Sequence, residues 1–211
     1  MLGTQDLWIF IGAGMALKIV PGQDFVFIAN RSSNFGFQGG ILVALGATSG
    51  TLVHILVATF GLSALIMASP NTFILVKVIG GLYLVYMGLC MLLKSPVKAH
   101  NTLSSVRYFS HSTIFYQGFL TNALNPKVTL FFIAFVPQFI VPDTPNVSLS
   151  FLFLDFIFSF NGLVWCLVVA WISTHISTKF KHALILTRRN NKAAGGLFTY
   201  FGVNLLMSSG H

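Results

Sequence analysis

Long apolar runs are the feature that most constrains how this chain can fold. Several stretches of 18 or more residues carry at most one charged side chain. Runs of this length can cross the hydrocarbon core of a bilayer as helices. Only 8% of the 211 residues are charged, against about 25% in a soluble domain, so the chain cannot build a water-facing surface. We predict an all-α integral membrane protein with a single transmembrane domain over residues 1–211.

The apolar runs predict six transmembrane helices, numbered here as the first to the sixth span. These spans cover about residues 6–30, 38–67, 71–93, 112–141, 148–173 and 192–209. The connections 94–111 and 174–191 are longer than the others, polar and basic. The first charge is Asp6, and no small-residue cleavage site follows a short apolar core, so we expect a mature first span rather than a signal peptide.

The basic residues predict the orientation of the spans. The net charge is +8, and nine of the twelve lysines and arginines fall in the connections after the first, third and fifth spans. They are Arg31, Lys94, Lys98, Arg107, Lys179, Lys181, Arg188, Arg189 and Lys192. The positive-inside rule places these connections in the cytoplasm and both termini outside it. Membrane topology therefore accounts for the excess of basic residues, and we expect no nucleic-acid partner.

Short sequence matches indicate two related halves. Residues 27–29 and 132–134 both read Phe-Ile-Ala, at equal distances from Pro21 and Pro126. Gly80-Gly-Leu-Tyr83 in the third span corresponds to Gly195-Gly-Leu-Phe198 in the sixth. Because each half has three spans, the second must be inverted in the membrane, as in many transporters. We predict repeat one at about 1–93, a cytoplasmic basic linker at about 94–111, and repeat two at about 112–211.

Pro21 and Pro126 are predicted to interrupt the first and fourth spans. Proline removes a backbone donor and clashes with the preceding turn, and Gly22 and Asn125 are residue types that help a chain leave a helix. Each proline lies 14 residues into its span, about 21 Å at 1.5 Å per residue, so both breaks fall near the midplane. The N-termini of the second half-helices would favour an anion such as a carboxylate. The alternative is a simple structural kink at each proline.

Ionisable residues inside the spans are the main candidates for binding. Such charges are costly and mark pathways or pairs. Asp24 and Lys127 lie beside the two breaks: Asp24 can hold an ammonium or a proton, and Lys127 can hold a carboxylate or pair with Asp24. Lys18 and Asp155 are secondary candidates, and for Asp155 an ion pair, a proton site and a water-facing position all stay open.

Small and neutral polar residues complete the candidate site. Gly46 and Gly50 form a small-xxx-small pattern that permits close helix packing, with Thr51 beside them and His54 on the same face. His54 fits either a hydrogen-bonded packing role or a proton relay. The neutral polar side chains expected at a similar depth are those of Asn122, Asn125 and Asn161.

The chain offers no pattern for metal, cofactor or enzymatic chemistry. Cys90 and Cys166 form no CxxC motif and have no metal-ligand spacing. We find no nucleophile–base pair and no cofactor-binding loop, so we expect neither an enzyme nor a cofactor. A thiol–disulfide redox carrier remains an alternative, disfavoured because we expect neither cysteine near a helix break. A passive channel or partner subunit is the other alternative.

The most specific motif lies in the fourth span. The run Gly118-Phe-Leu-Thr-Asn122-Ala-Leu-Asn125-Pro126-Lys127, followed by Pro137-Gln138-Phe139, closely resembles the signature of the LysE/RhtB family of amino-acid exporters. The segments Pro21-Gly22 with Asp24, Gly46 to His54, and Gly80 to Gly88 fit the same family. The match covers nearly the whole chain in order.

The resemblance implies an inner-membrane exporter of amino acids or close derivatives that is driven by the proton gradient. The two inverted halves predict alternating access as its mechanism. The expected site residues are Pro21, Gly22, Asp24, Gly46, Gly50, His54, Asn122, Asn125, Pro126 and Lys127, with Lys18, Thr51, Asp155 and Asn161 as secondary candidates. Many members carry an acidic residue where this chain has Thr51, which favours a neutral amino acid over lysine or arginine. The partners expected are the amino acid, protons and lipid, and small-residue faces permit a homodimer.

Overall fold

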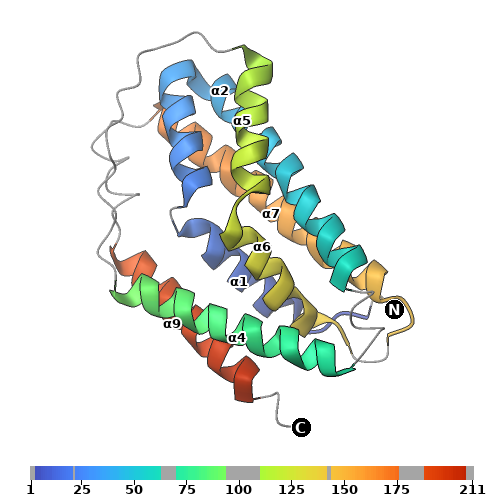
Figure 1. The fold of residues 1–211 in the computed structure, drawn as a ribbon. Coiled ribbons are helices and arrows are strands. Elements are labelled where there is room, and N and C mark those ends of the chain that lie inside the picture. The colour runs from blue at the N-terminus through green and yellow to red at the C-terminus, as the bar shows by residue number, and fades with distance from the viewer. Residues whose placement is uncertain are drawn as a thin grey trace.

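The computed structural model describes residues 3–20, 22–62, 70–93, 110–141, 144–175 and 188–207, and this part of the chain is helical (Figure 1). Among the described residues, the only β-type pairing is an isolated antiparallel bridge between Thr4 and Ile140. The helices are α1 (Leu7–Ile19), α2 (Gln23–Leu56), the π-helix η1 (Val57–Leu62), α4 (Pro70–Leu93), α5 (His111–Ala123), α6 (Pro126–Ala134), the 3-10 helix η2 (Val136–Phe139), α7 (Val147–His175) and α9 (Arg188–Met207).

Length and hydropathy identify membrane-spanning helices in the described part of the chain. Gln23–Gly61 and Val147–His175 are each long and apolar enough to cross a bilayer, and the bent pair His111–Ala123 with Pro126–Phe139 adds a third if it counts as one span. Shorter apolar helices cover Leu7–Ile19, Val78–Leu93 and Gly195–Met207. The protein is thus an all-helical membrane protein, while the arrangement of six spans as inverted repeats stays a prediction.

Both predicted helix breaks are present. The first lies between the end of α1 at Ile19 and the start of α2 at Gln23; Pro21 itself lies outside the described residues. The second lies between α5 and α6, where the axes bend by 47°. Here Pro126 occupies the first turn of α6, and the Asn125 side chain caps it by accepting a hydrogen bond from the Lys127 N–H. Proline at that position loses no helical hydrogen bond, because the first N–H groups of a helix have no partner within the helix.

Gly36 reverses the direction of α2. The predicted end of the first span at residue 30 is wrong, because the helix continues past Arg31 before Phe35 and Gly36 leave helical geometry. Gly36 has φ 68° and ψ −171°, a conformation that is almost confined to glycine. Figure 1 shows α2 turning at this point and running back past α5 and α7.

Glycines allow α2 and α5 to pack backbone to backbone. A Cβ atom on Gly46 would lie 2.2 Å from the carbonyl oxygen of Phe115, and one on Gly50 would lie 2.6 Å from that of Phe119. On α5, a Cβ on Gly118 would lie 2.7 Å from the Val43 carbonyl. The small-residue pattern therefore produces close helix contact, as such patterns do in membranes.

The remaining helices close around an aromatic core. Phe131 and Phe132 of α6 are buried against Phe10 of α1 and Phe158 of α7. Phe135, which follows the end of α6, is buried against Phe131 in the same core. On the outside of this core α4 and α9 lie side by side (Figure 1). The predicted basic linker falls mostly on residues 94–109, and Asp143 and residues 176–187 are also outside the described residues.

Replacement of Gly46 by alanine tests the close contact between α2 and α5. We expect Gly46→Ala to lower the unfolding temperature in detergent by several degrees, since overpacking costs about 1–3 kcal/mol. Gly12→Ala is the matched control, because a Cβ at Gly12 meets nothing within 4 Å. Equal unfolding temperatures for the two variants, measured by fluorescence-detected size exclusion after heating, would contradict the contact.

Candidate transport site

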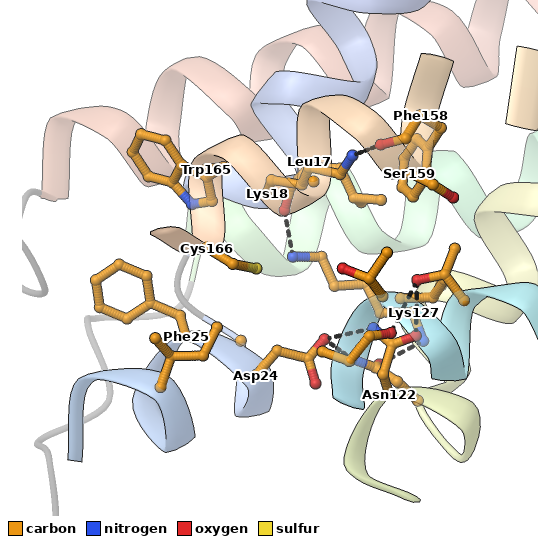
Figure 2. A pocket seen from close by; sticks show the side chains of 18 of the residues that line it. Leu17, Lys18, Asp24, Phe25, Asn122, Lys127, Phe158, Ser159, Trp165 and Cys166 are labelled. Atoms are coloured by element: carbon orange, nitrogen blue, oxygen red, sulfur yellow. Dashed lines mark hydrogen bonds between the residues drawn. The ribbon is translucent and has the colours of Figure 1, made fainter. Parts of the chain in front are cut away.

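A cavity of about 80 Å³ lies where the two helix breaks meet (Figure 2). A water molecule needs about 10–15 Å³ of such space, so the cavity can hold several waters or a small polar solute. Residues of α1, α2, α5, α6 and α7 line it, and most of their side chains are apolar. The polar side chains in the lining are those of Lys18, Asp24, Thr48, Thr51, Asn122, Asn125, Lys127 and Ser159. An apolar wall with a few polar groups is the usual composition of a small-molecule site.

Asp24 is held in place by two amides. It lies in the first turn of α2, directly after the break at Gly22. The Asn122 Nδ2 donates to Asp24 Oδ2 at 3.0 Å, and the Asn125 Nδ2 donates to the same oxygen at 3.2 Å. Both amides come from the break in the fourth predicted span, so the two breaks contact each other through this carboxylate.

Thr51 and His54 fix the orientation of Asn122. The Thr51 hydroxyl and the Asn122 Oδ1 lie 3.0 Å apart, which leaves the amide N–H groups to face Asp24. The His54 Nε2 lies 2.9 Å from the Asn122 carbonyl oxygen, and its Nδ1 lies 3.3 Å from the Thr129 hydroxyl. Because a carbonyl only accepts, Nε2 carries a proton in this arrangement. His54 thereby bridges α2 and the break between α5 and α6.

Lys127 binds the end of α1. Its ammonium donates to the carbonyl oxygens of Leu17 at 2.5 Å and Val20 at 3.3 Å. Unpaired carbonyls and the helix dipole both favour a cation at a helix C-terminus. Among the described residues no ion pair joins Lys127 and Asp24, although the two charges are close enough to attract each other. Of the roles left open for Lys127, direct pairing with Asp24 is therefore not observed.

Lys18 lies on the opposite side of the cavity from Asp24 and Asn122 (Figure 2). Its ammonium donates to the Phe158 carbonyl and lies 3.5 Å from the centroid of the Phe158 ring. Gly162 allows this approach, because a Cβ there would lie 2.9 Å from the Lys18 Nζ. A cation on an aromatic face is stabilised by the ring quadrupole.

Three polar atoms of the lining are buried without a hydrogen-bond partner. They are Asp24 Oδ1, Ser159 Oγ and Trp165 Nε1. Buried polar atoms are nearly always paired, so each exception needs an explanation. The set contains an anionic acceptor, a hydroxyl and an N–H donor around one cavity. Such a set matches a small ligand that carries both an ammonium and a carboxylate.

The structure brings part of the predicted site together. Among the predicted residues, those that line the cavity are Lys18, Gly22, Asp24, Thr51, Asn122, Asn125 and Lys127. His54 supports the lining from behind, and Gly46 and Gly50 pack against α5. Pro126 starts α6, and Asn161 and Asp155 do not belong to the lining. Ser159 and Trp165 were missed, since a serine and a tryptophan in an apolar run carry no signal of their own.

Cys166 also lines the cavity, so the expectation that both cysteines lie away from the helix breaks is wrong. It faces the cavity from α7, in the same lining as Gly22 and Asp24. The error arose because the distance along the chain from each proline says nothing about which helix packs opposite it. Cys90, on α4, does not contribute to the lining, and both thiols are free.

A helical membrane fold with a cavity between two broken helices is an arrangement that membrane transporters use. The family of LysE type translocators matches residues 15–209, so the chain belongs to this family and the predicted resemblance is confirmed. Membership of this family identifies the protein as a transporter rather than an enzyme.

Individual relatives cover almost the whole chain. An uncharacterised membrane protein of Pseudomonas aeruginosa is 29% identical over 207 residues, which are 97% of this chain and 96% of that protein. A leucine efflux protein of Salmonella typhimurium is 28% identical over 207 residues, covering 96% of this chain and 95% of the relative. A leucine efflux protein of Enterobacter sp. is 27% identical over 203 residues, with 96% of each chain covered. No solved structure matches the chain.

Substitution of Asn125 separates its two roles. We expect Asn125→Ala to destabilise the protein by about 1 kcal/mol at any pH, because α6 loses its cap. Asn125→Asp keeps the cap but places a second carboxylate against Asp24. Two adjacent carboxylates repel until one is protonated, so this variant should be destabilised at neutral pH and recover as the pH falls. Unfolding temperatures at neutral pH and at about pH 5 measure this, and a pH-independent deficit in Asn125→Asp would contradict the observed contact.

Proposed function

We propose that this protein exports neutral amino acids or close derivatives from the cytoplasm. The observation that carries the proposal is the Asp24 carboxylate, which lies at two helix breaks with one oxygen held by amides and the other unpartnered in the cavity. Membership of the LysE type translocators and similarity to leucine efflux proteins support the substrate class. Leucine is therefore the first amino acid to test.

The polar groups of the cavity suit the two charged ends of an amino acid. Asp24 Oδ1 would accept the ammonium, because a buried carboxylate oxygen without a partner gains a charge-assisted hydrogen bond there. The carboxylate would lie near Gly22 and Lys127, where the start of α2 has no side-chain cap and its dipole favours an anion. Ser159 and Trp165 offer further donors on the α7 side of the same cavity.

The remaining lining favours a neutral side chain. Asp24 is the only carboxylate in the described lining, and the proposed ammonium contact occupies it. A lysine or arginine substrate would need a second anion for its side chain, and the place where many relatives have one is Thr51. Apolar groups from α2 and α7, including Phe25, Ile28 and Val169, provide surface for an aliphatic chain instead.

Alternating access between two inverted halves is the mechanism proposed. The half-helices α1 and α5 have the same length of 13 residues. The third helices of the two halves, α4 and α9, pack against each other, which accords with a two-fold relation between the halves. We further propose proton antiport in the inner membrane with both termini outside the cytoplasm, which accords with the positive-inside rule.

Two other functions make different demands on these residues. A thiol–disulfide carrier needs two cysteines that can meet, and Cys166 in the cavity lining keeps this alternative testable. A passive channel or partner subunit needs no carboxylate at paired helix breaks. Exchange of amino acids by a protein lacking both cysteines would exclude the redox carrier, and saturable counterflow would exclude the channel.

Counterflow in proteoliposomes tests the role of Asp24. We expect unlabelled leucine inside to drive uptake of labelled leucine, and Asp24→Asn to reduce this exchange roughly 30- to 150-fold, the equivalent of about 2–3 kcal/mol for a charge-assisted contact. Asp6→Asn is the control, since Asp6 is exposed and makes no side-chain cap to α1. Full exchange in Asp24→Asn, or export of lysine with none of leucine or threonine, would refute the proposal.

Cys166 reports on occupancy of the cavity. In a Cys90→Ser variant, we expect leucine to slow the reaction of Cys166 with N-ethylmaleimide, because substrate and reagent compete for the same space. In a Cys166→Ser variant, labelling of Cys90 on α4 should not respond to leucine. Labelling followed by mass spectrometry measures both rates, and an equal response of the two thiols would argue against binding in this cavity.

A further inference from the structure

A second buried carboxyl lies outside the cavity. The Asp155 side chain on α7 is 0% exposed, and neither of its oxygens has a hydrogen-bond partner. The Thr59 side chain on η1 is also 0% exposed, with its hydroxyl unpartnered. The two side chains lie close enough to interact, and α7 packs against η1. Two buried polar groups with no other polar partner thus lie near each other inside the protein. A π-helical turn, which is frequent at functional sites, carries one of them.

No charged group neutralises Asp155 in the described part of the chain. Its neighbours along α7, Phe151, Leu154 and Phe158, belong to the aromatic core. The helices η1 and η2, which pack against α7, contain no titratable side chain. The titratable and charged groups on the other elements packed against α7 have partners of their own: Lys18, Asp24, Arg31, His54 and Lys127. On α7 itself, Cys166 and His175 lie three or more turns away.

A carboxylate without a counter-charge is unstable in such a place, whereas the neutral acid is not. We propose that Asp155 is the proton-carrying group of the transporter and that Thr59 is its hydroxyl partner. The proposal rests on the proposed function, which includes proton antiport. In this proposal the two carboxyl groups have separate roles: Asp24 binds the ammonium of the amino acid, and Asp155 binds the proton.

The composition of the chain supports this division. The sequence has four aspartates and no glutamate. Asp6 lies at the outer end of the first predicted span, and Asp143 lies in the connection between the fourth and fifth spans. Asp24 and Asp155 are therefore the two carboxyls in the interior of predicted spans. If the carrier binds the ammonium at one carboxyl group and the proton at another, these two aspartates are the candidates for the two roles.

The position of Asp155 connects it to the cavity. Ser159 lies four residues further along α7, on the same helix face, and its unpartnered hydroxyl belongs to the cavity lining. Phe158 lies about 4.5 Å along the axis from Asp155, and this buried residue lines the cavity. A change at Phe158 when the amino acid binds would open or close the route between Asp155 and Ser159.

Asp155 also lies in the half of the molecule that is predicted to face outward. It is in the first part of α7, the helix that starts beside Gly3, since a Cβ at Gly3 would lie 2.9 Å from the Ser150 hydroxyl oxygen. In the predicted orientation this end faces the outside of the cell, from which an antiporter takes its protons. The carboxyl is thus placed to load from outside when the core opens there.

The experiment separates exchange from proton-driven flux with Asp155→Asn, an isosteric variant that mimics the neutral acid. Purified full-length protein in liposomes is assayed for leucine counterflow at equal pH, and for leucine flux driven by a pH gradient or by a sodium gradient. We expect Asp155→Asn to keep the counterflow and lose the stimulation by the pH gradient. Thr59→Val should weaken the stimulation, and Asp6→Asn should leave it unchanged.

Infrared difference spectroscopy across a pH titration provides a readout that does not depend on transport. The carbonyl band of a protonated carboxylic acid should be present in the wild type and in Asp24→Asn and absent in Asp155→Asn. Retained pH stimulation in Asp155→Asn, or stimulation by sodium alone, would overturn the proposal. If the wild type exchanges no amino acid, the proposed function fails, and the infrared band then decides the proton site: its loss in Asp155→Asn supports the site, and its persistence refutes it.

Discussion

The contact between the Lys127 ammonium and the carbonyls at the end of α1 is the interaction on which the rest of this structure depends. A helix that stops inside a membrane leaves backbone groups without partners, and lipid cannot satisfy them. Here each break is satisfied by the other half of the chain. Lys127, from the second break, binds Leu17 and Val20 at the first, while Asp24, from the first, receives amides from Asn122 and Asn125 at the second. Two irregular segments thereby become mutually stable.

This reciprocal arrangement also explains why the polar groups of the cavity are concentrated at the two helix breaks. The groups that satisfy the breaks use only part of their hydrogen-bonding capacity, and the remainder points into the cavity. Asp24 keeps one oxygen without a partner, and α7 contributes Ser159 and Trp165 from the opposite wall. The close packing of α2 against α5 at Gly46 and Gly50 holds Thr51 and His54 against Asn122. Glycines outside the cavity lining thus help to orient the amide that holds Asp24.

Several features of the fold and site were predictable because local chemistry specifies them. Proline at residue 126 after an asparagine specifies a break followed by a capped helix, and that is found at α6. The glycine pattern in α2 specifies a close helix contact. The extent of the helix beyond residue 30 was mispredicted, because Arg31 suggested a loop, whereas its guanidinium bonds Gln117 and packs over Phe27 and Phe35 within the protein.

The sequence by itself determined that the chain is a helical membrane protein with two interrupted helices, since apolar run length, proline and capping residues act within a few residues of one another. Only the tertiary structure decided which side chains face the cavity. Ser159, Trp165 and Cys166 reach it because α7 packs across the breaks, and Asp155, four residues from Ser159, instead meets Thr59 in the core. The physical reason is that the direction of a helical side chain is specified by the chain, while its partner depends on which helix lies opposite. That choice follows from packing between helices that are distant in the sequence, such as α7 and α2.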